Sequence, residues 1–483
     1  MTPRKPHTNA YGPQAGRQAR PSAQRAQKNA SVRIARHDRA AAKRASVKAA
    51  KVQSIPTARD EAPSKLDEKA FTIPNSELVV TRRHLLYGAI GVGAVAAAST
   101  AAAALGVFGQ QEDLDILSVP AASVTSSDAL SEVELDSRFG LVGNFELPYG
   151  TLVWCNDDAV AACLIPGEAA KPLTQIQLLF LGNGVATTIV EQAVGQDEGF
   201  EIYDVRATSE GVIWTEADIL EGSWRIYTAA LSEGGALLEP ALVDQGNSDW
   251  ETPTLAMVGN YAFWQVMPNT AGNATSSGSA LKKARAGSTD VEVPYVSNGR
   301  MATAPCPTRD GVVITPRTDT STVHYQLTYL DARTNDVLDT LILPQSMKPL
   351  EASYGRTGFM FCFEGIYDYG DGIANLGTYV PMRAATGSGY SNVPWFRWSR
   401  TPLCAPCWCD DYLVVKSTQS VCGIGLESLS YAAIDVETGS DDYGDFLAST
   451  GQSSYLVTFA NVDSHPINEE AEQYCRVRVY AAL

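Results

Sequence analysis

The sequence predicts an all-β fold, a β-propeller, for residues 139–483, and two observations lead to it. From about Phe139, short runs of β-branched and aromatic residues alternate with Gly, Asn, Asp and Pro, without a convincing amphipathic helix. One of these runs, a turn residue followed by an apolar strand, recurs at intervals near 50 residues. Four strands in about 50 residues is the unit of a propeller blade.

The recurring run has further strands around it. Its copies begin at Gly150, Gly211, Asn260, Gly311, Gly358, Asp411 and Ser454, with spacings of 61, 49, 51, 47, 53 and 43 residues. A short strand precedes each run, as at 252–258. A strand with alternating apolar and polar residues follows the run, as at 431–439, and another strand comes after that one, as at 337–343. Aromatic residues occupy matching positions of the run, which predicts core packing between blades for Trp154, Trp214, Trp264 and Phe361.

On this pattern, residues 139–483 resemble the TolB-like and WD-repeat-like propellers, although the Gly-His and Trp-Asp dipeptides of WD repeats are absent. The seven runs predict about seven four-stranded blades, and six or eight blades are the alternatives. Because the chain ends at Leu483 before the last blade is complete, we expect residues 133–147 to supply a strand and close the ring, which removes exposed sheet edges. A pair of β-sandwiches is the alternative fold, but it would not need a repeat near 50 residues.

The N-terminal part of the chain has the opposite charge from the rest. Residues 1–83 carry a net charge of +12 and the remainder −29. Few apolar side chains accompany the basic residues, so we expect a disordered cytoplasmic tail. The tail is suited to anionic lipid headgroups or, less well, to nucleic acid, because no aromatic residues or nucleic-acid-binding fold accompany the charge. A solvated determinant of membrane topology is the third interpretation.

An uncharged segment separates the two parts and predicts one transmembrane or signal-anchor helix over 84–108. Its 24 residues from Leu85 to Phe108 carry no charge, which is enough to cross a bilayer; a buried soluble helix is the alternative. Arg82 and Arg83 just before it resemble the twin-arginine export signal, and as plain flanking charges they favour the same orientation. We therefore expect a single-pass protein of the cytoplasmic membrane with an extracytoplasmic C-terminal domain. Whether this segment is cleaved or stays as an anchor is left open by the sequence. Residues 109–138, which follow it, are interpreted as an acidic stalk.

The cysteines are the strongest local signal for chemistry. All nine follow the predicted span, in a compartment where disulfides can persist, and an odd number leaves at least one unpaired within the chain. Cys404, Cys407 and Cys409 form a Cys-x-x-Cys-x-Cys cluster on a predicted inner strand and turn. The alternatives for this cluster are a structural disulfide or buried thiols, a redox pair, and half of a zinc site.

Other catalytic signatures are missing. His324 and His465 are the only histidines after the predicted span, and there is no nucleophile elbow, zinc-protease motif or phosphate-binding loop. The acid-rich turns at 368–371 and 435–445 do not follow the full calcium-loop pattern. Trp395, Trp398 and Trp408 are less regularly placed and suit either a binding surface or the core. We expect no cofactor and no metal.

These observations favour a non-enzymatic module that binds an envelope protein, peptide or glycan at the funnel of the ring, or acts as a scaffold for it. The alternative is a cell-envelope lyase or hydrolase, which needs Asp or Glu, Tyr and Arg residues converging in that funnel. A relay from the propeller to the basic tail is a third hypothesis. All three depend on fold analogy, because propellers serve many functions.

Overall fold

The computed structural model describes residues 71–72, 79–80 and 114–483, except 168–172, 275–276, 321, 346, 364–372, 374–375, 401–402, 435, 437–439, 441–442 and 465–471. The chain divides into two units, Met1–Arg82 and Arg83–Leu483. In the first unit, β1 (Phe71–Thr72) pairs antiparallel with β2 (Val79–Val80). The rest of the predicted tail and the whole predicted span lie outside the described residues. Within the described part of the chain, no helix is long and apolar enough to cross a membrane.

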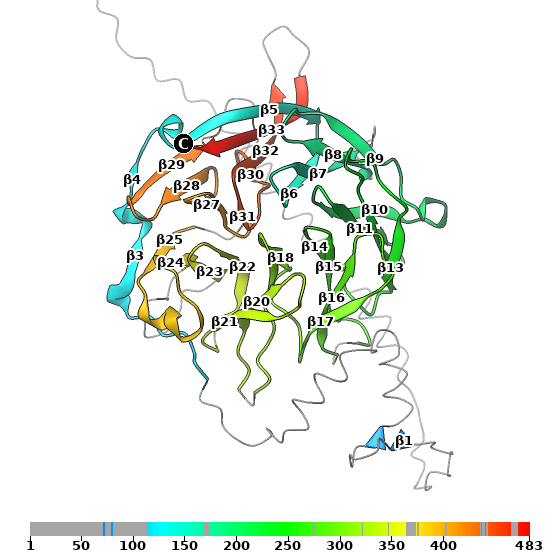
Figure 1. Cartoon of the computed structure of the whole chain (residues 1–483), viewed down its shortest axis with the longest axis horizontal. Helices are drawn as coiled ribbons and strands as arrows, with labels where there is room; N and C mark the ends of the chain where they lie inside the picture. Colours follow the sequence, from blue (N-terminus) through cyan, green and yellow to red (C-terminus); the bar gives the residue numbers. More distant parts are fainter. Residues whose placement is uncertain are drawn as a thin grey trace, which may run out of the picture. The chain divides into compact units, whose positions relative to one another are not determined.

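Residues of the second unit form a β-propeller (Figure 1). Six blades each contain four consecutive antiparallel strands, and in chain order their strands are β6 (Leu152–Cys155), β7 (Val160–Pro166), β8 (Leu173–Phe180) and β9 (Ala186–Val190); β10 (Glu201–Ala207), β11 (Gly211–Asp218), β12 (Ser223–Ala230) and β13 (Ala241–Gly246); β14 (Thr254–Val258), β15 (Tyr261–Val266), β16 (Ser279–Arg285) and β17 (Glu292–Ser297); β18 (Cys306–Pro307), β19 (Gly311–Ile314), β20 (Gln326–Asp331) and β21 (Val337–Ile342); β22 (Pro349–Gly355), β23 (Gly358–Phe363), β24 (Gly377–Pro381) and β25 (Trp395–Trp398); β26 (Cys407–Cys409), β27 (Tyr412–Lys416), β28 (Val421–Gly425) and β29 (Ser430–Ile434).

The prediction of about seven four-stranded blades is corrected to six continuous blades, because the remaining strands come from both ends of the domain. They form a composite sheet of β30 (Phe446–Leu447), β32 (Tyr455–Ser464), β33 (Glu472–Ala482) and β5 (Phe139–Pro148), which we call the closing sheet. β5 pairs with β33 from Tyr474↔Pro148 to Ala482↔Phe139. The expectation that a segment before the first blade closes the ring is thus confirmed. A short strand, β31 (Gln452–Ser453), pairs with β26.

The segment before β5 lies along the outer edges of three blades, and we call residues 114–138 the belt. Ile116 bridges to Ile342 of β21, β3 (Val124–Ser126) pairs in parallel with β25, and β4 (Ser131–Glu132) pairs in parallel with β29. Three 3₁₀ turns, Ala121–Ser123, Ser127–Ala129 and Leu135–Ser137, connect these contacts. The described part of the predicted stalk is therefore not a free linker: it covers sheet edges that would otherwise be open to pairing.

The core lies between neighbouring sheets. Trp214, Trp264 and Phe361 are fully buried, as the matching positions predicted. Trp395, Trp398 and Trp408 are also buried, which places them in the core rather than on a binding surface. Two other 3₁₀ turns, Gln196–Glu198 and Gly387–Asn392, connect strands. Tyr390 in the second of these donates a hydrogen bond from its hydroxyl to Oδ2 of Asp339 at 2.6 Å, and burial raises the pKa of the tyrosine.

Glycine in the recurring turn has a steric reason. Gly358 has φ of 115°, a conformation that other residues rarely adopt, and a Cβ atom there would also clash with Tyr390. Gly311 has ordinary dihedrals, but a Cβ atom there would collide with the backbone oxygen of Leu330 on the next strand. Close approach of neighbouring atoms therefore favours glycine at Gly311, and turn conformation together with close approach favours it at Gly358.

Candidate functional site

A cavity of about 410 Å³ lies where the first strands of the blades meet, and we call it the central cavity. Every blade and the closing sheet contribute to its lining, which consists of Trp154, Arg206, Leu255, Thr303, Ala304, Pro305, Cys306, Pro307, Leu350, Glu351, Ala352, Leu403, Cys404, Ala405 and Thr450. Its volume falls within the range of small-molecule sites. This is the funnel position at which the sequence-based hypotheses placed a ligand.

Most of the lining is apolar. Leu350 and Leu403 expose 39% and 50% of their surface although they are large aliphatic residues, and Ala304 is also exposed. Exposed aliphatic side chains that gather around a cavity are a common mark of a binding surface. The cavity can therefore hold an apolar group against these three residues.

Arg206 on β10 is one of two charged residues in the lining. Its Nη1 atom lies 2.5 Å from Oδ1 of Asp204 and also donates to the backbone oxygen of Val205 at 2.5 Å. The guanidinium carbon lies 4.5 Å from the centre of the Trp154 ring. An ion pair and a cation–π contact together fix the position of this cation at the cavity wall.

Glu351 on β22 is the other charged residue, and it is engaged by its neighbours. The buried Arg400 side chain pairs with both carboxylate oxygens of Glu351. Arg400 also donates from Nε to Thr378 at 2.6 Å and from Nη2 to the backbone oxygen of Cys404 at 3.1 Å. Burial raises the pKa of Glu351, and Arg400 and the backbone amides of Leu403 and Cys404 oppose this shift. The carboxylate thus holds the loop before β26 in place, rather than being poised as a general base.

The nine cysteines are free thiols, and Cys404 is the only one of them that is not buried. Cys407 and Cys409 lie on the first strand of their blade, as predicted, and Cys404 and Cys306 line the central cavity. Burial raises the pKa of Cys404 to about 12 and of Cys306 to about 11. A redox Cys-x-x-Cys needs the opposite, a lowered pKa that keeps the attacking sulfur as thiolate. The redox and disulfide interpretations of Cys404, Cys407 and Cys409 stay predictions, and the raised pKa favours inert thiols.

Alkylation of Cys404 by iodoacetamide at pH 8 is expected to be about 100-fold slower than that of a free cysteine, since little thiolate is present below its pKa. The rate should rise about tenfold per pH unit up to pH 10. Mass spectrometry of the Cys404 peptide after timed alkylation measures both quantities. Complete modification within minutes at pH 8 would contradict the raised pKa and support the redox interpretation.

Trp154 is a residue whose place the sequence pattern predicted incorrectly. The run beginning at Gly150 is β6, a first strand, whereas the six other runs correspond to second strands of their sheets. The second strand of the first blade, β7, begins at Val160, which is 51 residues before Gly211. Trp154 is therefore half-buried at the central cavity instead of lying in the core. The outlying spacing of 61 residues was the signal that could have revealed this.

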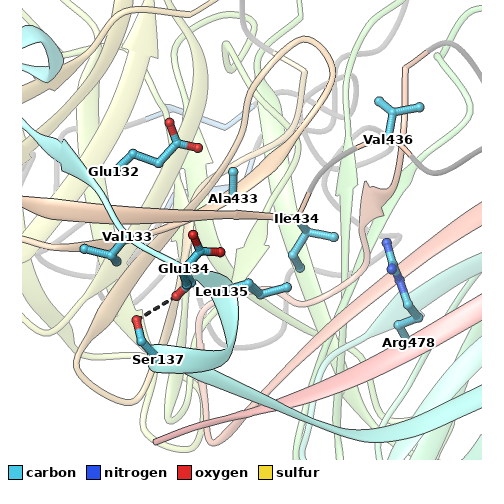
Figure 2. A pocket seen from close by; sticks show the side chains of 9 residues that line it. All are labelled: Glu132, Val133, Glu134, Leu135, Ser137, Ala433, Ile434, Val436 and Arg478. Atoms are coloured by element: carbon cyan, nitrogen blue, oxygen red, sulfur yellow. Dashed lines mark hydrogen bonds between the residues drawn. The ribbon is translucent and has the colours of Figure 1, made fainter. Parts of the chain in front are cut away.

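A larger cavity of about 780 Å³ lies beside the belt (Figure 2). Figure 2 shows Glu132 and Glu134 of the belt and Arg478 of β33 around Leu135 and Ile434. Glu132 accepts a hydrogen bond from the Tyr431 hydroxyl at 3.0 Å, and Arg478 pairs with Asp445 at 2.8 Å. This cavity forms where the belt leaves the edge of β29, and it involves only one blade and the closing sheet.

Some of the other residues singled out in the sequence belong to the part of the chain that the structure describes, and others do not. Arg82, Arg83, His465 and the turn at 368–371 lie outside the described residues. His324 is buried, with Nδ1 2.9 Å from the backbone oxygen of Leu343, which fits a structural role. Among the described residues, no group of three or more His, Cys, Asp or Glu side chains is arranged to hold a metal ion.

Comparison with known proteins does not assign this chain to a family. No protein-family description matches the sequence. No curated protein matches it either. Among solved structures, a prolyl endopeptidase is 11% identical with a TM-score of 0.42, covering 86% of this chain but only 56% of the peptidase. Oligogalacturonate lyase from Vibrio parahaemolyticus is 8% identical with a TM-score of 0.38, covering 70% of this chain and 97% of the lyase.

The β-propeller domain of the Trilobed protease from Pyrococcus furiosus is 10% identical with a TM-score of 0.36, covering 57% of this chain and 83% of that domain. Similarity at this level supports no conclusion about this chain. It brings no activity to this chain, so function has to be argued from the residues of the central cavity.

Proposed function

We propose that this chain is a non-enzymatic binding module whose propeller holds a ligand in the central cavity. The observation that carries the proposal is the lining itself, in which the exposed apolar residues Ala304, Leu350 and Leu403 accompany one fixed cation, Arg206. Within that lining, the charged residue that could act as a base, Glu351, is engaged by Arg400, and the thiols have raised pKa values. Binding of a ligand does not require a free carboxylate or a thiolate, whereas catalysis by these residues would require one.

Filling the cavity tests this proposal. Ala304→Trp places an indole at the exposed apolar rim and is expected to weaken capture of an envelope ligand by about tenfold or more, because the ligand and the indole compete for one volume. Ala186→Trp, on the exposed outer strand β9, is the matched control and should leave capture unchanged. Ligands eluted from the wild-type chain and both variants would be quantified by mass spectrometry. Equal capture by all three chains would contradict a ligand site in the cavity.

We place the propeller on the outer side of the cytoplasmic membrane, anchored by residues 84–108 with the basic tail 1–83 inside. The proposal rests on the uncharged span, the charge reversal around it, and the Arg82-Arg83 pair. The tail would lie on anionic lipid headgroups of the inner leaflet. An N-terminally tagged chain should be recovered at full length in membrane fractions, and recovery of only a short tagged fragment would indicate cleavage instead.

The twin-arginine interpretation has a charge-conserving test. Replacing both Arg82 and Arg83 with lysine keeps the positive flank, so a plain topology anchor would still be exported. If export instead depends on recognition of the arginine pair, the lysine variant should not be exported. The propeller would then stay inside the cell, and added protease would not cleave it in intact cells.

The alternative function is a cell-envelope lyase or hydrolase acting in the same cavity. It needs a carboxylate, a tyrosine and an arginine together, and the described lining provides Arg206 and Glu351 without a tyrosine. Turnover of a peptide or a polyuronate by the purified chain that disappears in Arg206→Gln would favour this alternative over the binding module.

A further inference from the structure

The chemistry of the ligand follows from the unused donors of Arg206, and this inference rests on the proposed ligand site in the central cavity. A guanidinium has five N–H donors in a planar fork. In Arg206, Nη1 is used by Asp204 and by the backbone oxygen of Val205. Among the described residues, neither Nε nor Nη2 of Arg206 has a hydrogen-bond partner. These two atoms form the edge of the guanidinium that pairs with a carboxylate through two parallel hydrogen bonds.

Arg400, which binds Glu351 of the lining, provides the contrast. Its Nε donates to Thr378, and its two terminal nitrogens bind the carboxylate of Glu351. The buried arginine thus has an internal carboxylate that fills its fork, and the cavity-lining arginine does not. Among the described residues, no hydrogen bond or ion pair joins Glu351 to Arg206, whose ion pair is with Asp204.

The orientation of Arg206 is fixed before any ligand arrives. The ring of Trp154 lies against the face of the guanidinium at 4.5 Å, and Asp204 holds one end at 2.5 Å. Asp204 does not belong to the cavity lining, so its carboxylate holds the arginine from outside the cavity. A fixed cation loses little conformational freedom on binding, which favours affinity.

The rest of the lining decides what accompanies the anionic group. Leu350 and Leu403 are exposed aliphatic residues of the same cavity, and Ala304 and Pro305 extend the apolar surface. We propose that the central cavity binds a small apolar carboxylate, with its carboxylate on the Nε–Nη2 edge of Arg206 and its apolar part against Leu350 and Leu403. The carboxyl-terminal residue of a peptide and a fatty acid both provide this chemistry.

Binding to the full chain is measured by titration calorimetry with three probes: N-acetyl-Ala-Leu with a free carboxylate, the same dipeptide as its amide, and decanoate. The free dipeptide is expected to bind roughly 10- to 150-fold more tightly than the amide, the effect of hydrogen bonds to a charged group. Binding of decanoate alone would identify a fatty acid as the source of the carboxylate, and binding of the dipeptide alone a peptide terminus. The carboxylate-to-amide comparison uses the wild-type chain and does not depend on how any variant folds.

Arg206→Gln should abolish the preference for carboxylate over amide. Arg225→Gln is a matched control, because Arg225 on β12 also pairs with an acid, Glu198, and lies 4.1 Å over an aromatic ring, Phe200, but does not line the cavity. Equal binding of dipeptide and amide that is lost in Ala304→Trp would overturn the carboxylate inference and leave the proposed cavity function standing. If neither the free dipeptide nor decanoate binds at millimolar concentration, the carboxylate inference is also wrong. The capture experiment with Ala304→Trp and Ala186→Trp then tests separately whether the cavity binds a ligand.

Discussion

Replacing Phe139 with alanine is expected to lower the free energy of unfolding by about 3–5 kcal/mol, the usual cost of removing a buried phenylalanine. Phe139 begins β5, exposes 2% of its surface and lies 5.0 Å, ring centre to ring centre, from Tyr412 of the neighbouring blade. It therefore connects the strand that completes the closing sheet to the last continuous blade. Denaturant unfolding followed by intrinsic fluorescence measures the loss.

The same strand supplies a control. Leu141 lies two residues further along β5 and exposes 54% of its surface, so Leu141→Ala should change the free energy of unfolding by less than about 0.5 kcal/mol. Similar losses in both variants would mean that β5 contributes through strand pairing alone. A loss below about 1 kcal/mol for Phe139→Ala would contradict the closure of the ring by this strand.

Replacing Asp445 with asparagine is expected to destabilise the protein by about 3–5 kcal/mol, because it removes a buried charge that pairs with Arg476 and Arg478. Asp445 exposes 1% of its side chain, and its Oδ1 lies 2.8 Å from Nη2 of Arg478 and 3.3 Å from Nη2 of Arg476. Its Oδ2 accepts hydrogen bonds from Thr458 at 2.6 Å and Arg478 at 3.0 Å. Asparagine keeps the size of the side chain and removes the charge, so thermal unfolding isolates the electrostatic part.

Asp290→Asn is the control for this second substitution, since Asp290 is exposed. Its melting temperature should stay within about 1 °C of the wild type, as is usual for surface changes. An equally small change in melting temperature for Asp445→Asn would show that the contacts of Asp445 with Arg476 and Arg478 are not essential to the stability of the closing sheet. Asp445 ends the acid-rich turn at 435–445, and its carboxylate is engaged by Arg476 and Arg478.

The sequence predicts the propeller because the signals of this fold are local. A turn residue followed by an apolar aromatic strand marks most blades. The pattern fails at β7, whose sequence Val-Ala-Ala-Cys-Leu-Ile-Pro has neither a turn glycine nor an aromatic residue, so that the preceding strand β6 matches the pattern instead. The belt was missed for a similar reason, since β3 and β4 are three and two residues long and give no strand signal.

The candidate site was less predictable than the fold, because its contacts join distant strands. Glu351 and Arg400 are 49 residues apart, and Arg206 and Trp154 come from different blades. A single sequence contains no information about which arginine finds a carboxylate inside the protein and which keeps free donors. The sequence predicts the funnel of the ring as the location of a ligand site. The chemistry of that site depends on which side chains surround the funnel, and only the structure shows this.

Hydrogen exchange of the full chain with and without N-acetyl-Ala-Leu, at a concentration that saturates binding, tests the cavity as the ligand site most directly. A ligand in the central cavity should slow exchange of the backbone amides at 303, 304, 306 and 403–405, which line it, and leave exchange at 132–137 in the belt unchanged. Protection confined to 132–137, with no change at 303, 304, 306 and 403–405, would contradict a ligand site in the central cavity.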